Sequence, residues 1–113
     1  MTADEFREVA LALDGAIERA HMGHPDFRAD GKIFATLRAG EAAGTVKLLP
    51  DEQREYMRLH PKAFAPASGA WGRQGWTTVR LDVADRAAVR GAMMLAWQHV
   101  LESRRKPRAR TRR

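Results

Sequence analysis

The sequence predicts a two-layer α+β sandwich, in which a mostly antiparallel sheet carries its helices on one face. Two stretches, one near each end of the chain, repeat apolar residues at helical spacing. Between them, Asp30-Gly31 separates two short apolar runs, a pattern typical of a two-residue β-hairpin. Because few of the expected strands are separated by helices, neighbouring strands should run antiparallel. The expected order is about α-β-β-β(-β)-α-β-α.

The first helix is expected over residues 3–13. Thr2 and Glu5 have the spacing of a capping box, in which each side chain accepts a hydrogen bond from a backbone N–H at the helix start. Apolar side chains then recur at helical spacing: Phe6, Val9, Ala10 and Leu13. Asp14-Gly15 should end the helix, because glycine commonly follows the last helical turn. After this break, residues 17–20 favour a short strand over a continued helix.

A hairpin and a further strand follow in the first half of the chain. Asp30-Gly31 should form its turn, with Phe27 before it and Ile33 and Phe34 after it. Residues 38–44 are small and polar and predict a loop. Residues 45–49 are mostly apolar and β-branched, and they predict a strand.

The second helix is expected to begin at Pro50. Proline suits the first helical position, and the two acids that follow it would lie at the positive end of the helix dipole. The helix should end near His60-Pro61. Residues 62–70 then predict a loop in which Phe64 serves as an apolar anchor.

Two tryptophans frame the segment Trp71-Gly72-Arg73-Gln74-Gly75-Trp76. Its glycines permit positive φ and close backbone approach, so the segment predicts a sharp turn. Residues 76–81 then alternate between bulky and polar types, as in a strand with one buried face. We interpret Trp71, Gly72, Gly75 and Trp76 as structural anchors that hold the turn to the core and present Arg73 and Gln74 outward. Alternatively, both indoles are ordinary core residues and the turn has no further role.

The last helix should begin after Asp85, a suitable N-cap residue, and extend for about 17 residues. Its apolar positions have helical spacing: Val89, Met93, Trp97 and Val100. A cluster of Met93, Met94 and Trp97 could suggest a cofactor pocket, but this periodicity favours core packing.

The chain has the size and composition of one soluble domain. Its 113 residues are 44% hydrophobic, and no apolar run approaches the about 18 residues that a membrane span requires. The acidic N-terminus does not resemble a secretory signal. The chain has no cysteine, which excludes disulfides and thiolate metal ligands and suits a reducing compartment. We therefore expect a cytoplasmic protein, with a domain over residues 1–102 and a disordered basic tail over 103–113.

The net charge of +6 is concentrated in that tail. Residues 103–113 contain seven basic residues and no acid, so the rest of the chain is nearly neutral. Within the rest, residues 23–80 hold nine basic and six acidic residues, whereas both flanking segments are acidic. If the flanks are helical and the middle is mostly sheet, the sheet side is the basic side.

The chain resembles the MmcQ/YjbR family. The resemblance is carried by four stretches in order: His24-Pro25-Asp26-Phe27-Arg28, Gly31-Lys32-Ile33-Phe34-Ala35-Thr36-Leu37, His60-Pro61, and Trp71-Gly72-x-x-Gly75-Trp76-Thr77. It extends from the first helix to about residue 101 and leaves out only the tail. It implies an α+β fold similar to secretion chaperones and to the frataxin-like (CyaY-like) arrangement. Family members are commonly described as DNA-binding proteins that use turns of the sheet as wings, and no catalytic residues are agreed for them.

The function expected from these features is weak, largely sequence-independent DNA binding through the phosphate backbone. Arg73 and Gln74 lie at the glycine-framed turn, where such side chains can hydrogen-bond to base edges. The other candidate contacts are basic residues of the strands, loops and tail: Arg28, Lys32, Arg38, Lys47, Arg104, Arg105, Lys106, Arg108, Arg110, Arg112 and Arg113. An ordinary solvated surface and a tail that only aids solubility are the alternatives.

A second reading is a peptide- or protein-binding adaptor that does not bind nucleic acid. A chaperone-like sheet can accept a partner across its open face or at an edge strand, and the nearly neutral body favours this reading. We expect a monomer or a weak homodimer in either case.

The sequence predicts neither an enzyme nor a metal site. His21, His24, His60 and His99 lack the spacing of a ligand set, although His24-Pro25-Asp26 could orient a base or simply form a turn. Nucleotide-binding loops, metalloprotease motifs and nucleophile elbows are absent from the sequence. We expect no catalytic residues, no metal and no cofactor.

Overall fold

The computed structural model describes residues 1–38 and 42–105, with side chains placed through residue 103. Its elements follow in the order α1 (Ala3–Leu11), β1 (Ile17–His21), β2 (His24–Ala29), β3 (Lys32–Leu37), β4 (Ala43–Lys47), α2 (Pro50–Leu59), β5 (Phe64–Pro66), α3 (Gly69–Arg73), β6 (Trp76–Arg80) and α4 (Arg86–Arg105). The strands form one six-stranded sheet in the order β1-β2-β3-β4-β6-β5, and every neighbouring pair is antiparallel.

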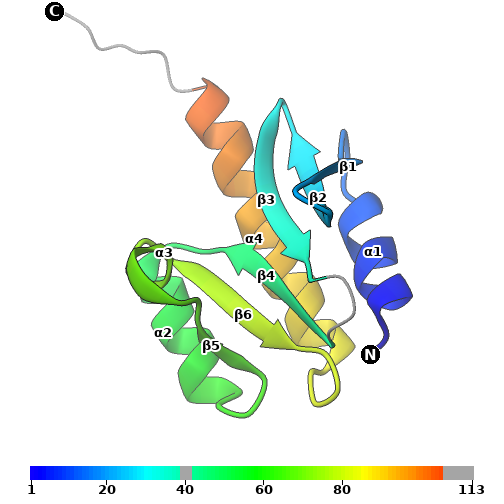
Figure 1. Cartoon of the computed structure of the whole chain (residues 1–113). Helices are drawn as coiled ribbons and strands as arrows, with labels where there is room; N and C mark the ends of the chain where they lie inside the picture. Colours follow the sequence, from blue (N-terminus) through cyan, green and yellow to red (C-terminus); the bar gives the residue numbers. More distant parts are fainter. Residues whose placement is uncertain (39–41, 106–113) are drawn as a thin grey trace, which may run out of the picture.

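The fold is the predicted two-layer sandwich (Figure 1). The helices α1, α2 and α4 cover one face of the sheet, and α4 packs on β2, β3 and β4. The other face is open except at one end, where the short helix α3 lies beside β5 and β6. None of the helices in residues 1–38 and 42–105 is long and apolar enough to cross a membrane.

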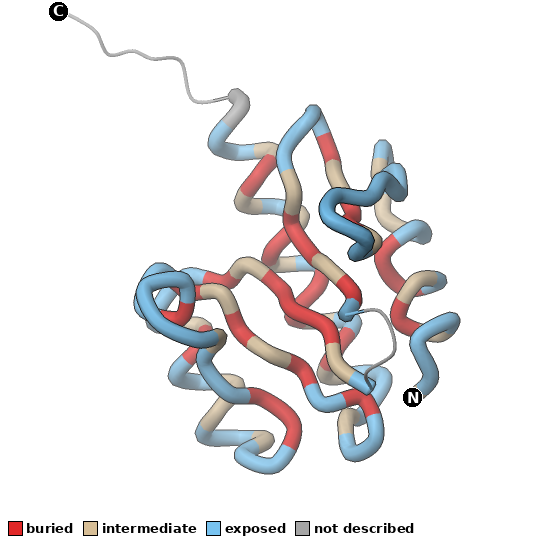
Figure 2. Tube along the Cα trace, in the orientation of Figure 1, coloured by how far each residue is buried: buried red, intermediate tan, exposed pale blue. Residues whose placement is uncertain are grey.

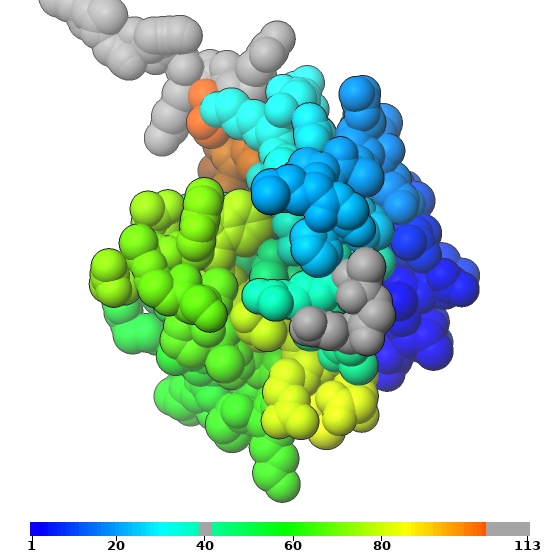
Figure 3. Space-filling model, in the orientation of Figure 1, coloured from blue at the N-terminus to red at the C-terminus, as the bar shows by residue number. Residues whose placement is uncertain are grey.

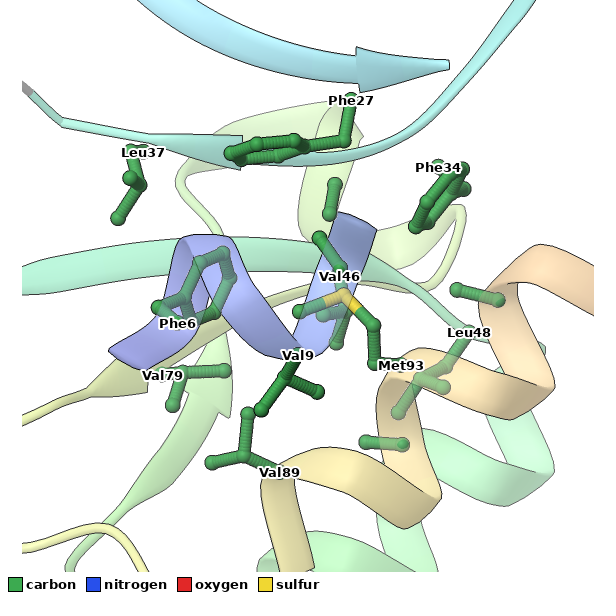
Figure 4. Packing of buried hydrophobic residues seen from close by; sticks show 14 of the residues in the cluster. Phe6, Val9, Phe27, Phe34, Leu37, Val46, Leu48, Val79, Val89 and Met93 are labelled. Carbon is green, nitrogen blue, oxygen red and sulfur yellow. The ribbon is translucent and has the colours of Figure 1, made fainter. Parts of the chain in front are cut away.

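The hydrophobic core lies between the sheet and the long helices (Figures 2 and 4). Phe6 of α1 and Met93 of α4 face Phe27 of β2, and all three are fully buried. A bulge between β2 and β3 leaves Phe34 without a paired residue, because Phe27 pairs with Ala35 and Arg28 pairs with Ile33. The extra residue lets the consecutive Phe34 and Ala35 both enter the core.

The predicted start of α1 is confirmed, but its predicted end at residue 13 is wrong. Thr2 Oγ1 accepts a hydrogen bond from Glu5 N at 3.1 Å, and Glu5 Oε1 accepts one from Thr2 N at 2.7 Å. The helix ends at Leu11, and Leu13 N then bonds Ala10 O, three residues back, as in a tightened last turn. Leu13 still packs against the core, so the apolar periodicity outlasts the helix.

Both early strand predictions are confirmed. Asp30 and Gly31 have φ of 52° and 77° and join β2 to β3 in the predicted two-residue turn. A second turn of the same kind, at Met22 and Gly23 with φ of 50° and 81°, joins β1 to β2.

The middle of the chain differs from the prediction in two places. The fourth strand occupies residues 43–47 rather than 45–49, because Leu49 is the N-cap residue of α2 and Pro50 is its first helical residue, as predicted. The predicted loop over 62–70 contains β5, whose residues pair with β6. Phe64 is 2% exposed, which confirms its predicted role as an anchor.

The last helix begins as predicted and ends later. Ala88 N donates to Asp85 Oδ2 at 3.2 Å, which confirms Asp85 as the N-cap. The helix extends for 20 residues to Arg105, so residues 103–105 belong to the helix and not to the predicted tail. The remaining predicted tail, residues 106–113, lies outside the described part of the chain.

Candidate nucleic-acid interface

The sheet face without long helices is the candidate site, and we call it the open face. Directly paired residues of neighbouring strands share a face, and successive residues alternate between faces. The register therefore places a row of side chains across the open face from β1 to β6: Arg19, Asp26, Thr36, Thr45 and Thr78. The same alternation adds His21, His24, Lys47, Trp76 and Arg80.

The strands are basic, whereas the three long helices together are neutral, because α4 holds four basic residues and one acid. The six strands contain five basic and two acidic residues, whereas α1 and α2 together contain six acidic and three basic residues. Both strand acids are paired: Glu18 accepts from Arg7 Nε of α1 at 2.9 Å, and Asp26 is held within the sheet. The distribution agrees with the expectation that the sheet side is the basic side.

Asp26 is fully buried beneath two side chains of the open face. Its carboxylate accepts hydrogen bonds from Arg28 Nε at 2.7 Å, from Arg28 Nη2 at 3.1 Å and from His21 Nδ1 at 2.6 Å. The Arg28 hydrogen bonds lower the pKa of Asp26, outweighing the opposing effect of burial, and His21 lowers it further. Asp26 therefore stays ionised and holds His21 and Arg28 in fixed orientations.

The two tryptophans do not both belong to the core, so the predicted anchoring by Trp71 is wrong. Trp71 lies on α3, and 62% of its surface is exposed, whereas Trp76 at the start of β6 is half-buried. Their rings meet edge to face with centroids 6.3 Å apart. Lys47 Nζ lies 6.0 Å from the Trp76 ring and donates to Gln74 O at 2.8 Å. The segment predicted as a turn is thus a short helix that presents one indole to solvent.

The two glycines of this segment are required by close backbone contacts. A Cβ atom at Gly72 would lie 2.1 Å from Ala67 O, and one at Gly75 would lie 1.8 Å from Leu48 O. Gly75 also has φ of 110°, which side-chain-bearing residues rarely adopt. The predicted need for Gly72 and Gly75 therefore has a steric basis.

A cavity of about 450 Å³ opens on this face between the β1–β2 hairpin and α3 (Figure 3). At its floor, Thr36 Oγ1 and Thr45 Oγ1 share a hydrogen bond of 2.6 Å. Its lining combines aromatic, hydroxyl and basic side chains: His21, His24, Ile33, Thr36, Leu37, Arg38, Thr45, Ala67, Ser68, Trp71 and Trp76.

The basic residues predicted to contact DNA are not all on the open face. Arg38 lines the cavity, and Lys47 lies beside Trp76. Arg73 and Gln74 are exposed at the end of α3, and Gln74 O accepts a hydrogen bond from Lys47 Nζ. Arg28 is on the open face but holds Asp26.

Lys32 faces the helix layer, since its Nζ donates to Ser103 Oγ of α4 at 2.9 Å. It therefore lies away from the open face, and its contact with DNA stays a prediction. Arg104 and Arg105 lie in the last turn of α4. The other predicted tail contacts lie outside the described residues: Lys106, Arg108, Arg110, Arg112 and Arg113.

The four histidines do not form a metal centre. His60 caps α2 through its backbone, and His99 Nε2 bonds Glu52 Oε1 of α2 at 2.8 Å. His21 and His24 face each other across the β1–β2 hairpin. Within residues 1–38 and 42–105, no group of three or more histidine, aspartate or glutamate side chains could hold a metal ion.

Several residues of the site were missed by the sequence predictions. Arg19 and the threonine row would have followed from strand alternation once the register was known. The hydrogen bond between His21 and Asp26 depends on the tight Met22-Gly23 turn, for which glycine was the available signal.

Comparison with known proteins supports this fold. A family model described as YjbR matches residues 11–99. The chain is similar to the crystal structure of Deinococcus radiodurans protein DR2400, which is described by the family-model domain DUF419. The TM-score is 0.80 at 19% identity, over 96% of this chain and 85% of that chain. No curated protein matches this chain. The family model spans the sheet, the cavity and most of α4, so the chain belongs to the YjbR family.

Proposed function

We propose that this protein binds DNA through the open face, weakly and with little sequence preference, as a cytoplasmic protein without a catalytic role or a cofactor. The carrying observation is the charge of the open face, where the strands place four basic side chains and one acid, Asp26, which is paired with Arg28. The strands are basic and their acids are paired, whereas α1 and α2 are acidic. A polyanion would be attracted to the sheet side and repelled from those helices.

Four basic side chains are suited to phosphate contacts. Arg19 and Arg73 are exposed, Lys47 is half-exposed beside Trp76, and Arg38 lines the cavity. They come from β1, α3, β4 and the end of β3, so they are spread over the sheet side of the molecule. Contacts of this kind position a nucleic acid without reading its bases, which accounts for the low sequence preference.

Arg28 and Lys32 have a smaller part in this proposal than the sequence suggested. Arg28 is committed to Asp26, and Lys32 lies against α4. Gln74 remains beside Arg73 at the end of α3, where it can add a hydrogen bond to phosphate or base. The basic residues beyond position 105 would add charge that is independent of the folded surface.

The test is fluorescence anisotropy with labelled duplex DNA over a salt series, using the full chain and residues 1–105. The core residues that the structure describes run from Phe6 to Val100, so this truncation keeps them. We expect 1–105 to bind with a measurable salt dependence. The full chain should show a steeper slope of log K against log salt, by at most about 4 to 5, because 106–113 adds five basic residues.

A matched pair of arginine variants locates the site. Arg19 and Arg90 are both exposed, but Arg19 is on the open face and Arg90 is on α4. Arg19→Ala should reduce the salt slope by about 1 and weaken binding, whereas Arg90→Ala should change neither. Equal effects of the two variants, or loss of all binding in 1–105, would show that the open face does not bind DNA.

A protein partner is the second candidate, and the edge strand β1 favours it. Every residue of β1 is exposed, and its outer edge has no neighbouring strand in the described sheet (Figure 2). Such an edge can pair with an extended peptide. If residues 1–105 bind no DNA, a role as a peptide- or protein-binding adaptor would be preferred. Ala20→Pro in β1 removes a backbone N–H from the edge strand and should then abolish capture of an extended peptide partner.

A further inference from the structure

We propose that the cavity on the open face accepts an unpaired nucleobase, so that the protein prefers single-stranded to duplex nucleic acid. This inference rests on the proposed function and names the class of nucleic acid that the site selects.

Trp71 supplies an aromatic surface at the cavity wall. The indole is 62% exposed although it belongs to a residue type that is usually well buried. It is held there by α3 and by edge-to-face contact with Trp76, at 6.3 Å between centroids. An exposed indole in a fixed position is the platform on which proteins stack unpaired bases, and such stacking tolerates any base.

The cavity has the size of a small-molecule site. Its volume of about 450 Å³ lies within the range of small-molecule pockets. A base inside a duplex is stacked on both sides and cannot enter such a cavity unless it leaves the helix, which costs free energy. An unpaired base can enter without that cost.

Thr36, Thr45 and His21 can form hydrogen bonds in the cavity with more than one kind of base. The paired hydroxyls of Thr36 and Thr45 can each donate or accept as the ligand requires. His21 is oriented by Asp26 through Nδ1, which leaves Nε2 as its other polar atom, and its side chain is 46% exposed. These groups therefore suit the polar edge of a base while Trp71 covers its plane.

The surrounding charges suit the backbone on either side of that base. Arg38 lines the cavity, Lys47 lies 6.0 Å from the Trp76 ring, and Arg73 ends the helix that carries Trp71. Asp26, the one acid that the described strands place on this face, is buried and paired with Arg28. A base in the cavity would thus have its flanking phosphates near cations.

The experiment measures binding of the full chain to three labelled probes of equal length, about 16 nucleotides, which spans the site size of such proteins. The probes are a mixed-sequence DNA strand, the duplex that it forms with its complement, and an abasic strand with the same phosphates and no bases. We expect the strand to bind at least about 5-fold more tightly than either other probe.

Trp71→Ala tests the stacking surface. It should weaken binding of the strand by at least about 5-fold and leave binding of the abasic strand and the duplex within about 2-fold. Trp71→Phe should retain most of the affinity. Leu59→Ala is the matched control, because Leu59 is an exposed apolar residue of α2, at 53%, away from the open face. Circular dichroism should show that all three variants are folded, since Trp71 and Leu59 are largely exposed.

Failure of this inference differs from failure of the proposed function. Equal binding of the strand and the abasic strand, with no effect of Trp71→Ala, would overturn the nucleobase site and leave phosphate binding intact. Absence of binding to all three probes would overturn both.

Discussion

Asp26 shows how a single residue organises one side of the site. It is a buried acid on a basic face, and burial of an unpaired carboxylate would be costly. Three hydrogen bonds, two from Arg28 and one from His21, compensate for this cost. The same hydrogen bonds fix His21 at the cavity wall. Asp26 is itself buried, but it thereby orients a side chain that lines the exposed cavity.

Replacement of Asp26 should reveal this role in the pH dependence of stability. The pKa of Asp26 is lowered from its ordinary 3.8, chiefly by the Arg28 hydrogen bonds. A carboxyl group with a lowered pKa in the folded state stabilises the fold above its unfolded pKa, and this contribution is lost as the pH falls through the folded pKa. Asp26→Asn should therefore lower the free energy of unfolding by about 1.5 kcal/mol at neutral pH, because it weakens the charge-assisted hydrogen bonds while leaving Arg28 and His21 partly hydrated. Its deficit relative to the parent protein should shrink below pH 3.8.

Urea unfolding of both proteins between neutral pH and the acid limit of folding measures this difference. Glu5 and Glu55 also have lowered pKa values, through Thr2 and Arg58 respectively, but they are present in both proteins and cancel in the comparison. A deficit that stays constant with pH would mean that the charge of Asp26 does not stabilise the fold.

At the scale of elements, Gln53 connects α2 to the segment that carries the tryptophans. Gln53 is buried, and its Nε2 donates to Gly72 O and Trp76 O, both at 3.0 Å, and to Thr77 Oγ1 at 3.1 Å. Its two amide hydrogens are shared among three acceptors. The side chain thus holds the end of α3 and the start of β6 against the helix layer.

Gln53→Met keeps the approximate volume and removes these hydrogen bonds. Gly72 O and Trp76 O keep their backbone donors, Gly75 N and Ala67 N, but the hydrogen bonds from the buried amide are lost, so the free energy of unfolding should fall by about 2 kcal/mol. Gln98→Met, on the exposed face of α4, should change it by less than about 0.5 kcal/mol. Chemical denaturation measures both values, and a similar small change in both variants would contradict the role of Gln53.

The elements that could be predicted from the sequence are those specified by neighbouring residues. The capping box at Thr2, the Asp30-Gly31 turn, Pro50 at the start of α2 and the Asp85 cap are all local interactions. The three-residue strand β5 was missed because its only basis is pairing with β6, a long-range contact.

The candidate site was predicted less well, and for a related reason. The exposure of Trp71 contradicts the usual burial of tryptophan and depends on how α3 packs beside Trp76. The position of Lys32 beside α4 could not be predicted, because the β2–β3 bulge and the length of α4 decide where its side chain lies. The basic character of the sheet side could be predicted, since it follows from composition by segment.

At the scale of the whole molecule, the central strands should resist local unfolding more than the edge strand β1, although β1 carries part of the candidate site. The central strands β3, β4 and β6 lie between two neighbours each, and their core-side residues are buried. β1 is an edge strand with every residue exposed, and it pairs with β2 alone. Yet β1 carries Arg19 and His21, so one wall of the cavity belongs to the least buried strand.

Amide hydrogen exchange should therefore divide the sheet into two classes. Amides that bond across the β4–β6 pair should exchange only through near-global unfolding, because exposing them requires opening the core. Those that bond between β1 and β2 should exchange through local opening, at a free energy at least about 2 kcal/mol lower. Native-state exchange read by NMR measures both, and equal protection would show that β1 unfolds only with the core. If single-stranded DNA enters the cavity beside His21, saturating DNA should slow exchange in β1 and in β4 by a similar factor, because local opening of β1 and global unfolding both abolish the bound state.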